Sequence, residues 1–149
     1  MCTKPILGRF AIKEDGIRAK QRVGVGINFS PVPLFEDIIR ASGCGIAVSV
    51  NEKKRGIVTL GISVKKKEEP FPHDNSTSHF YYAVETHLSW SRGIENAEGT
   101  GVFTASIPPF TKEDFLKAAM SRALEDLVRN KEKQQKLSLR RHRLLRNGG

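Results

Sequence analysis

The sequence predicts a two-layer α+β domain, in which an antiparallel sheet of about six strands carries two helices packed on one face. Two observations predict this class. Apolar and polar residues alternate in several segments, a pattern typical of strands that are buried on one side. Two other segments, near residues 35 and 120, carry apolar residues at helical spacing. Their order along the chain predicts the arrangement ββ-α-ββ-ββ-α.

The first expected element is a β-hairpin over residues 6–29. Ile6, Phe10 and Ile12 alternate with polar residues, and the alternation resumes after a short acidic loop that ends in Gly16. A short loop with glycine at its end is typical of a hairpin. Because strand side chains alternate between two faces, five basic residues are expected to share one face. These are Arg9, Lys13, Arg18, Lys20 and Arg22.

A short helix is expected next, between Pro31 and Gly43. Ser30 is a suitable N-cap, and proline is favoured at the first helical position, whereas glycine is favoured just after the last one. The apolar stripe of this helix consists of Leu34, Phe35, Ile38 and Ile39.

Two more strand pairs are expected in the middle of the chain. Residues 46–50 are predicted to pair with residues 58–64 across a turn, and residues 80–90 with residues 101–107, with a polar loop at 68–77. One face of these strands is apolar and the other is small and polar. The small polar face consists of Ala47, Ser49, Thr59, Gly61, Ser63, Ala83, Glu85, His87 and Ser89. Such a face is either solvated or a surface for a partner.

The last helix is expected to begin after Thr111 and to lie across the apolar face of the sheet. Its apolar stripe stops at Val128, which predicts a domain over residues 1–128 and a separate basic tail over residues 129–149. The tail has eight basic residues and one acid, so it holds +7 of the net charge of +9. The eight are Arg129, Lys131, Lys133, Lys136, Arg140, Arg141, Arg143 and Arg146.

No arrangement of residues predicts an enzyme, a metal site or a cofactor site. Cys44 and His87 are expected on opposite faces of the sheet, so they could not form a nucleophile and base pair. His73, Asp74 and His79 lie close together in a polar segment, but without the spacing of a metal site.

The charge distribution predicts a nucleic-acid-binding protein that contacts phosphate groups, with RNA favoured over DNA. Arginine side chains form paired hydrogen bonds with phosphate, and the tail is rich in arginine. The expected contacts are Arg9, Lys13, Arg18, Lys20, Arg22, Lys136, Arg140, Arg141, Arg143 and Arg146. The arginine cluster also suits a nuclear import signal.

The alternative hypothesis is a structural or adaptor protein that self-associates through the small polar face of the sheet. Small side chains would let two flat surfaces approach closely, and a symmetric homodimer is the commonest outcome of self-association. The two hypotheses are compatible with each other.

The sequence predicts an intracellular protein, cytoplasmic or nuclear, with no membrane partner. It contains no apolar run of membrane-spanning length, and its start lacks the apolar core of a signal peptide. The two cysteines do not suggest a disulfide framework. Cys44 is expected to be a small core residue, and Cys2 an exposed one.

Overall fold

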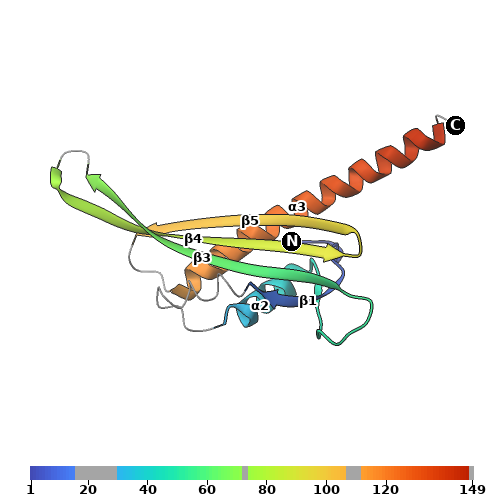
Figure 1. Ribbon diagram of the computed structural model, residues 1–149, viewed down its shortest axis with the longest axis horizontal. Coiled ribbons are helices and arrows are strands. Elements are labelled where there is room, and N and C mark those ends of the chain that lie inside the picture. The colour runs from blue at the N-terminus through green and yellow to red at the C-terminus, as the bar shows by residue number, and fades with distance from the viewer. Residues whose placement is uncertain (16–29, 72–73, 107–111, 148–149) are drawn as a thin grey trace.

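The computed structural model describes residues 1–15, 30–71, 74–106 and 112–147, which form one five-stranded mixed sheet and two helices (Figure 1). The strands are β1 (Arg9–Glu14), β2 (Ile46–Ala47), β3 (Gly56–Phe71), β4 (Asp74–Arg92) and β5 (Glu95–Ser106). The helices are α2 (Val32–Ser42) and α3 (Lys112–Asn147). The α+β class is therefore confirmed.

The strand order is β2-β1-β3-β4-β5, and β1 is parallel to both of its neighbours. The prediction of an entirely antiparallel sheet is wrong for this half of the sheet. A parallel pair needs a long crossover connection, which the chain from β1 through α2 to β2 supplies. Because β1 lies between β2 and β3, residues 46–50 do not pair with residues 58–64 as predicted. The strand expected over residues 17–29 lies outside the described residues.

The other half of the sheet is an antiparallel meander of β3, β4 and β5. The predicted pairing of residues 80–90 with residues 101–107 is confirmed for the described part, with Val84 opposite Phe103. The expected polar loop at 68–77 is shorter than predicted, because β3 continues to Phe71 and β4 begins at Asp74. The β3–β4 hairpin forms one end of the molecule (Figure 1).

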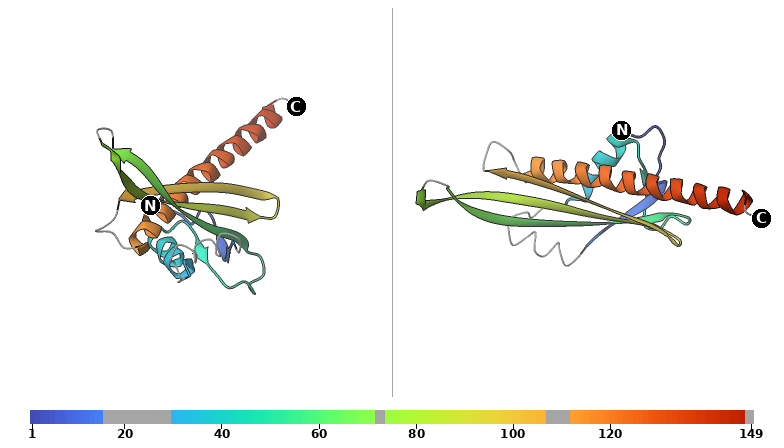
Figure 2. Two further views of the ribbon diagram at one scale, coloured as in Figure 1. Left: turned by 60° about the vertical axis from the view of Figure 1, so that its left-hand side comes forward. Right: turned by 90° about the horizontal axis from the view of Figure 1, so that it is seen from above.

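Both helices lie on the same side of the sheet (Figure 2). The core forms between this side and the helices, and α3 supplies much of it because its apolar residues recur at helical spacing. The largest fully buried side chains of the core are Trp90, Phe10, Phe35, Leu7, Ile39, Leu60, Leu88, Leu116, Met120, Leu124, Leu127 and Val58.

Two glycines in β5 let α3 pack directly against the strand backbone. A Cβ atom on Gly99 would lie 2.4 Å from the backbone N of Leu127. A Cβ atom on Gly101 would lie 2.3 Å from the backbone N of Ala123. No side chain larger than hydrogen fits at either position without moving the helix.

Helix α3 crosses residue 128 without a break and continues to Asn147. The interpretation of the basic segment as an appendage separate from the last helix is therefore wrong. The segment has no glycine or proline before residue 148, and Lys, Gln, Leu and Arg are good helix formers. Helix formation that begins in the packed part can therefore extend into the basic part.

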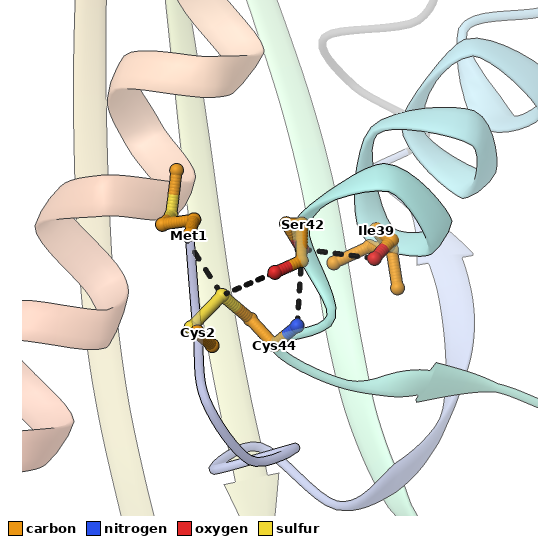
Figure 3. Close-up of a disulfide and its surroundings, with 5 residues drawn as sticks. All are labelled: Met1, Cys2, Ile39, Ser42 and Cys44. Carbon is orange, nitrogen blue, oxygen red and sulfur yellow. Dashed lines mark hydrogen bonds between the residues drawn. A yellow bond between two sulfur atoms is a disulfide. The ribbon is translucent and has the colours of Figure 1, made fainter.

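A disulfide joins Cys2 to Cys44, whose Cα atoms are 5.0 Å apart (Figure 3). The Cys2 N–H donates a hydrogen bond to the Ser42 carbonyl at 3.0 Å, and the Leu7 N–H donates to the Cys44 carbonyl at 2.9 Å. The N-terminal segment therefore runs beside the end of α2, where Gly43 ends the helix in a left-handed conformation. The expectation of two unpaired cysteines is wrong, because folding brings together two residues that are 42 positions apart.

Candidate functional site

The face of the sheet opposite α2 and α3 is the candidate site, and we call it the helix-free face. Its side chains alternate with the buried ones on β3, β4 and β5, so the predicted small polar face is confirmed on β3 and β4. It consists of Ile57, Thr59, Gly61 and Ser63 on β3, Ala83, Glu85, His87, Ser89 and Ser91 on β4, and Glu98, Thr100, Val102 and Thr104 on β5. Ala47 and Ser49, which were expected in the same patch, lie beyond β1 at the other edge of the sheet.

The exposed part of the helix-free face lies on β4 and on the edge strand β5. Ser89, Ser91, Thr100 and Thr104 are exposed, and Val102 keeps 45% of its surface exposed. Toward β3 the residues are half-buried or buried. This part of the sheet is therefore an accessible, small-residue surface with one apolar side chain.

A hollow of about 300 Å³ opens in the helix-free face around Gly61, which has Asp15 on one side and His87 on the other. Glu98, Thr59 and Thr100 also line it. The Nε2 atom of His87 lies 2.8 Å from Oε1 of Glu85, so the imidazole already has a carboxylate partner.

The helix-free face offers hydrogen-bonding groups. Both cysteines of the chain are in the disulfide, so no thiol is available as a nucleophile. Among the residues that the structure describes, no group of three or more His, Cys, Asp or Glu side chains could hold a metal ion. The arrangement suits contact with a polar surface.

The structure divides the predicted phosphate-contacting residues between two elements. Arg9 and Lys13 are exposed on β1 in the body, whereas Lys136 and Arg140 are exposed on the projecting end of α3 (Figure 1). Three further arginines belong to the last turns of α3, where the structure describes the backbone: Arg141, Arg143 and Arg146. Another three predicted residues lie outside the described part of the chain: Arg18, Lys20 and Arg22. The described residues do not form one basic surface.

Arg9 is already neutralised within the protein. Its guanidinium donates hydrogen bonds of 2.9 and 2.5 Å to the two carboxylate oxygens of Glu52. The hydrogen bond from Arg9 lowers the pKa of the Glu52 carboxyl group, and the same bond raises the pKa of Arg9. Arg9 therefore has a carboxylate partner within the protein.

Sequence reasoning missed the role of Lys131, which is only 6% exposed. Its Nζ atom lies 3.0 Å from Oε2 of Glu95 and 4.4 Å from the centre of the Trp90 ring. The sequence does indicate that Lys131 lies on the buried side of the helix, since it follows Leu127 by four residues. A lysine can bury its aliphatic stem and keep its charge paired at the edge of the core.

No protein-family model matches the chain, and no curated protein sequence matches it. The fold is similar to that of the crystal structure of rare lipoprotein B from Shewanella oneidensis, with a TM-score of 0.52 and 6% sequence identity. That match covers 85% of this chain and 98% of the other. A crystal structure of a minor lipoprotein from Acinetobacter baumannii matches with a TM-score of 0.46 and 5% identity, over 85% of this chain and 94% of the other. At these identities the likeness is one of fold.

These findings overturn the prediction of a cytoplasmic or nuclear nucleic-acid-binding protein. The fold is similar to that of a protein named as a lipoprotein. The disulfide also conflicts with an intracellular location, because disulfides persist mainly in oxidising compartments. The predicted RNA or DNA partner is therefore wrong. Of the helices in the described ranges, none is long and apolar enough to cross a membrane.

Proposed function

We propose that this protein is a non-enzymatic adaptor that self-associates through its helix-free face in an extracytoplasmic compartment. The observation that carries the proposal is the accessible, small-residue surface on β4 and β5, on the side of the sheet away from α2 and α3. Serine and threonine hydroxyl groups can pair with one another across such a contact, since each one both donates and accepts hydrogen bonds.

The residues in the middle of β5 suit a symmetric contact. Val102 is an exposed apolar side chain among hydroxyl-bearing neighbours, which include Thr100 and Thr104 on the same strand. Packed sheets are about 10 Å apart when ordinary side chains interdigitate, and small side chains allow closer approach. In a twofold dimer, the Val102 side chains of the two copies would form the dry centre of the contact.

The size of the surface predicts a weak dimer. Three strands about 4.8 Å apart and roughly nine residues long at about 3.4 Å per residue give about 440 Å² of sheet. Stable interfaces bury about 800 Å² on each partner. We therefore expect a dimer that dissociates on dilution.

Charge also acts against association. Each copy carries a net charge of +9, so two copies repel one another over a distance that salt shortens. Self-association is accordingly expected to strengthen as the salt concentration rises.

The disulfide supports the proposed compartment. Cys44 is fully buried, and the bond ties the N-terminal segment to the end of α2. Such a bond forms and persists where the surroundings are oxidising. The similar fold belongs to a protein named as a lipoprotein, which is consistent with an envelope-associated role for this chain.

Light scattering after size-exclusion chromatography, over a range of concentrations and at low and high salt, tests the proposal. The variant Thr100→Arg/Val102→Arg places two charges on the exposed part of the helix-free face and should abolish the dimer. The control Val50→Arg/Asn51→Arg adds the same charge at exposed positions between β2 and β3, and it should dimerise like the wild type. A strict monomer at every concentration, or a dimer in the helix-free-face variant, would reject self-association through this surface.

A further inference from the structure

Helix α3 leaves the body of the protein at Lys131. Up to that residue one side of the helix is buried against the sheet, and from Glu132 to Arg140 every residue is exposed. Figure 1 shows the helix continuing away from the sheet to its end at Asn147. We call residues 132–147 the projecting half of α3.

The last packed turn fixes the direction of the projecting half. Lys131 is held by the Glu95 carboxylate and the face of Trp90. The side-chain amide of Asn130 donates a hydrogen bond of 2.7 Å to the Glu98 carbonyl. These contacts fix the helix to β4 and β5 at the point where it leaves the sheet. The basic residues of the projecting half therefore extend from a fixed base.

The projecting half concentrates positive charge that no described ion pair neutralises. It has six basic residues and one acid, Glu132. The ion pairs of α3 among the described residues join Lys117 to Glu113, Arg129 to Asp126 and Lys131 to Glu95. None of these described pairs involves Lys133, Lys136 or Arg140.

These basic residues also form a row along one side of the helix. Arg129, Lys133, Lys136 and Arg140 follow one another at intervals of four, three and four residues, so like charges are one turn apart. Repulsion between these charges opposes helix formation, and a bound anionic partner would remove the repulsion by neutralising them. The row lies on the side of α3 away from the one that buries Leu127 and Lys131.

The alternating intervals favour a helix as the partner. A repeat of 3.5 residues keeps a row of side chains facing a second helix that winds around the first. Leu137, which is 57% exposed, lies next to Lys133 and Arg140 on this side and offers an apolar contact. A lipid surface would need its leucines on one side, but Leu137 and Leu139 point about 160° apart. The same segment of a second copy is repelled by like charge.

We propose that the projecting half of α3 is a docking element for an acidic helical segment of a protein partner, with Glu or Asp residues at the same 3.5-residue repeat. This interface is separate from the helix-free face, so the adaptor would hold a partner and a second copy of itself at once. The docking proposal and the self-association proposal can be tested separately, because a rise in salt concentration should weaken the docking of an acidic helix and strengthen the dimer.

Fluorescence anisotropy with a labelled synthetic helix of about three heptads, which carries glutamates and one leucine per heptad on its contact side, measures the docking. The full-length oxidised protein is compared with the variant Lys133→Glu/Lys136→Glu/Arg140→Glu. The control Lys4→Glu/Lys53→Glu/Lys54→Glu makes the same change in net charge at exposed positions of the body. A third variant, Leu137→Ser, changes no charge. Vesicles of phosphatidylglycerol are titrated in parallel.

The helix variant should bind the peptide at least about tenfold more weakly at low salt, and the body control within about twofold of the wild type. The variant L137S should lose about threefold of peptide affinity, the worth of a partly buried apolar side chain. An equal loss in the helix variant and the body control would overturn the proposal, because it would show attraction by net charge alone. Peptide affinity unchanged in L137S, or binding to the vesicles but not to the peptide, would also overturn it. Circular dichroism on each variant confirms that the helix is retained.

Discussion

The two halves of α3 have the same backbone conformation in opposite surroundings. The docked half, residues 112–131, buries Leu116, Met120, Leu124 and Leu127 against the sheet. The projecting half exposes every residue from Glu132 to Arg140. The difference shows that the docked half supplies the stability of the helix, whereas the projecting half supplies charge. Changes that loosen the docked half should unfold the body, and changes in the projecting half should leave the body folded.

The largest effect is expected from removal of the disulfide that holds the N-terminal segment beside the docked half. Residues Cys2, Thr3 and Ile6 of that segment line a cavity of about 410 Å³ together with Val128 and Glu125 of α3. The double variant Cys2→Ser/Cys44→Ser frees a loop of 42 residues in the unfolded chain, which should lower the free energy of unfolding by about 4 kcal/mol.

Urea denaturation of the oxidised wild type, the reduced wild type and the double variant measures this effect. The reduced wild type should match the double variant. A loss below about 1 kcal/mol would show that the bond contributes little to the body, against the expectation for a loop of this length.

The second effect concerns the close approach of the docked half to β5. In Gly101→Ala the new methyl group would lie 2.3 Å from a backbone atom of α3, which cannot move alone. The variant should lose about 3 kcal/mol, the upper range for overpacking. Gly93→Ala is the control: Gly93 has a φ of +62° but open space around it, so the variant should lose only about 1 kcal/mol of strain. Equal losses in the two variants would mean that α3 shifts easily on the sheet.

The comparison of the two halves also explains what could be predicted from the sequence. The buried and exposed sides of β4 were predictable, because Leu88 and Trp90 alternate with His87 and Ser89. The position of β1 was not, since alternation is the same in parallel and antiparallel strands. The start of α3 was predictable from its apolar stripe, but its end was not. Beyond Lys131 the helix depends on the helix propensity of its residues and on continuity with the docked half. Neither of these produces a periodic pattern of apolar residues in the sequence.

The candidate surfaces were predictable to a similar degree. The small polar side chains of the helix-free face could be found from strand periodicity, but their separation from Ala47 and Ser49 depends on the strand order. The pairing of Cys2 with Cys44 depends on where folding places the N-terminal segment, which no local pattern records.

A third, smaller effect is expected beneath the docked half, at Thr86 on the helix-covered side of β4. The side chain is fully buried, and its hydroxyl has no hydrogen-bond partner among the described residues. Thr86→Val keeps the shape and removes the unsatisfied group, so it should raise the free energy of unfolding by about 1 kcal/mol. Urea denaturation measures the change. A destabilised variant would show that the hydroxyl has a partner in solution, such as a buried water molecule.

The smallest effect is expected in the projecting half, from Lys133→Gln/Lys136→Gln. Both side chains are exposed and outside the described ion pairs, so their removal should change the free energy of unfolding by less than about 0.5 kcal/mol. Three like-charge contacts one turn apart are lost together: Arg129 to Lys133, Lys133 to Lys136, and Lys136 to Arg140. The helical circular dichroism signal should therefore rise slightly at low salt, and the difference from the wild type should vanish at high salt, where the charges are screened. A variant that unfolds more easily than the wild type would show instead that these lysines contact the body, and that the two halves of α3 are not independent.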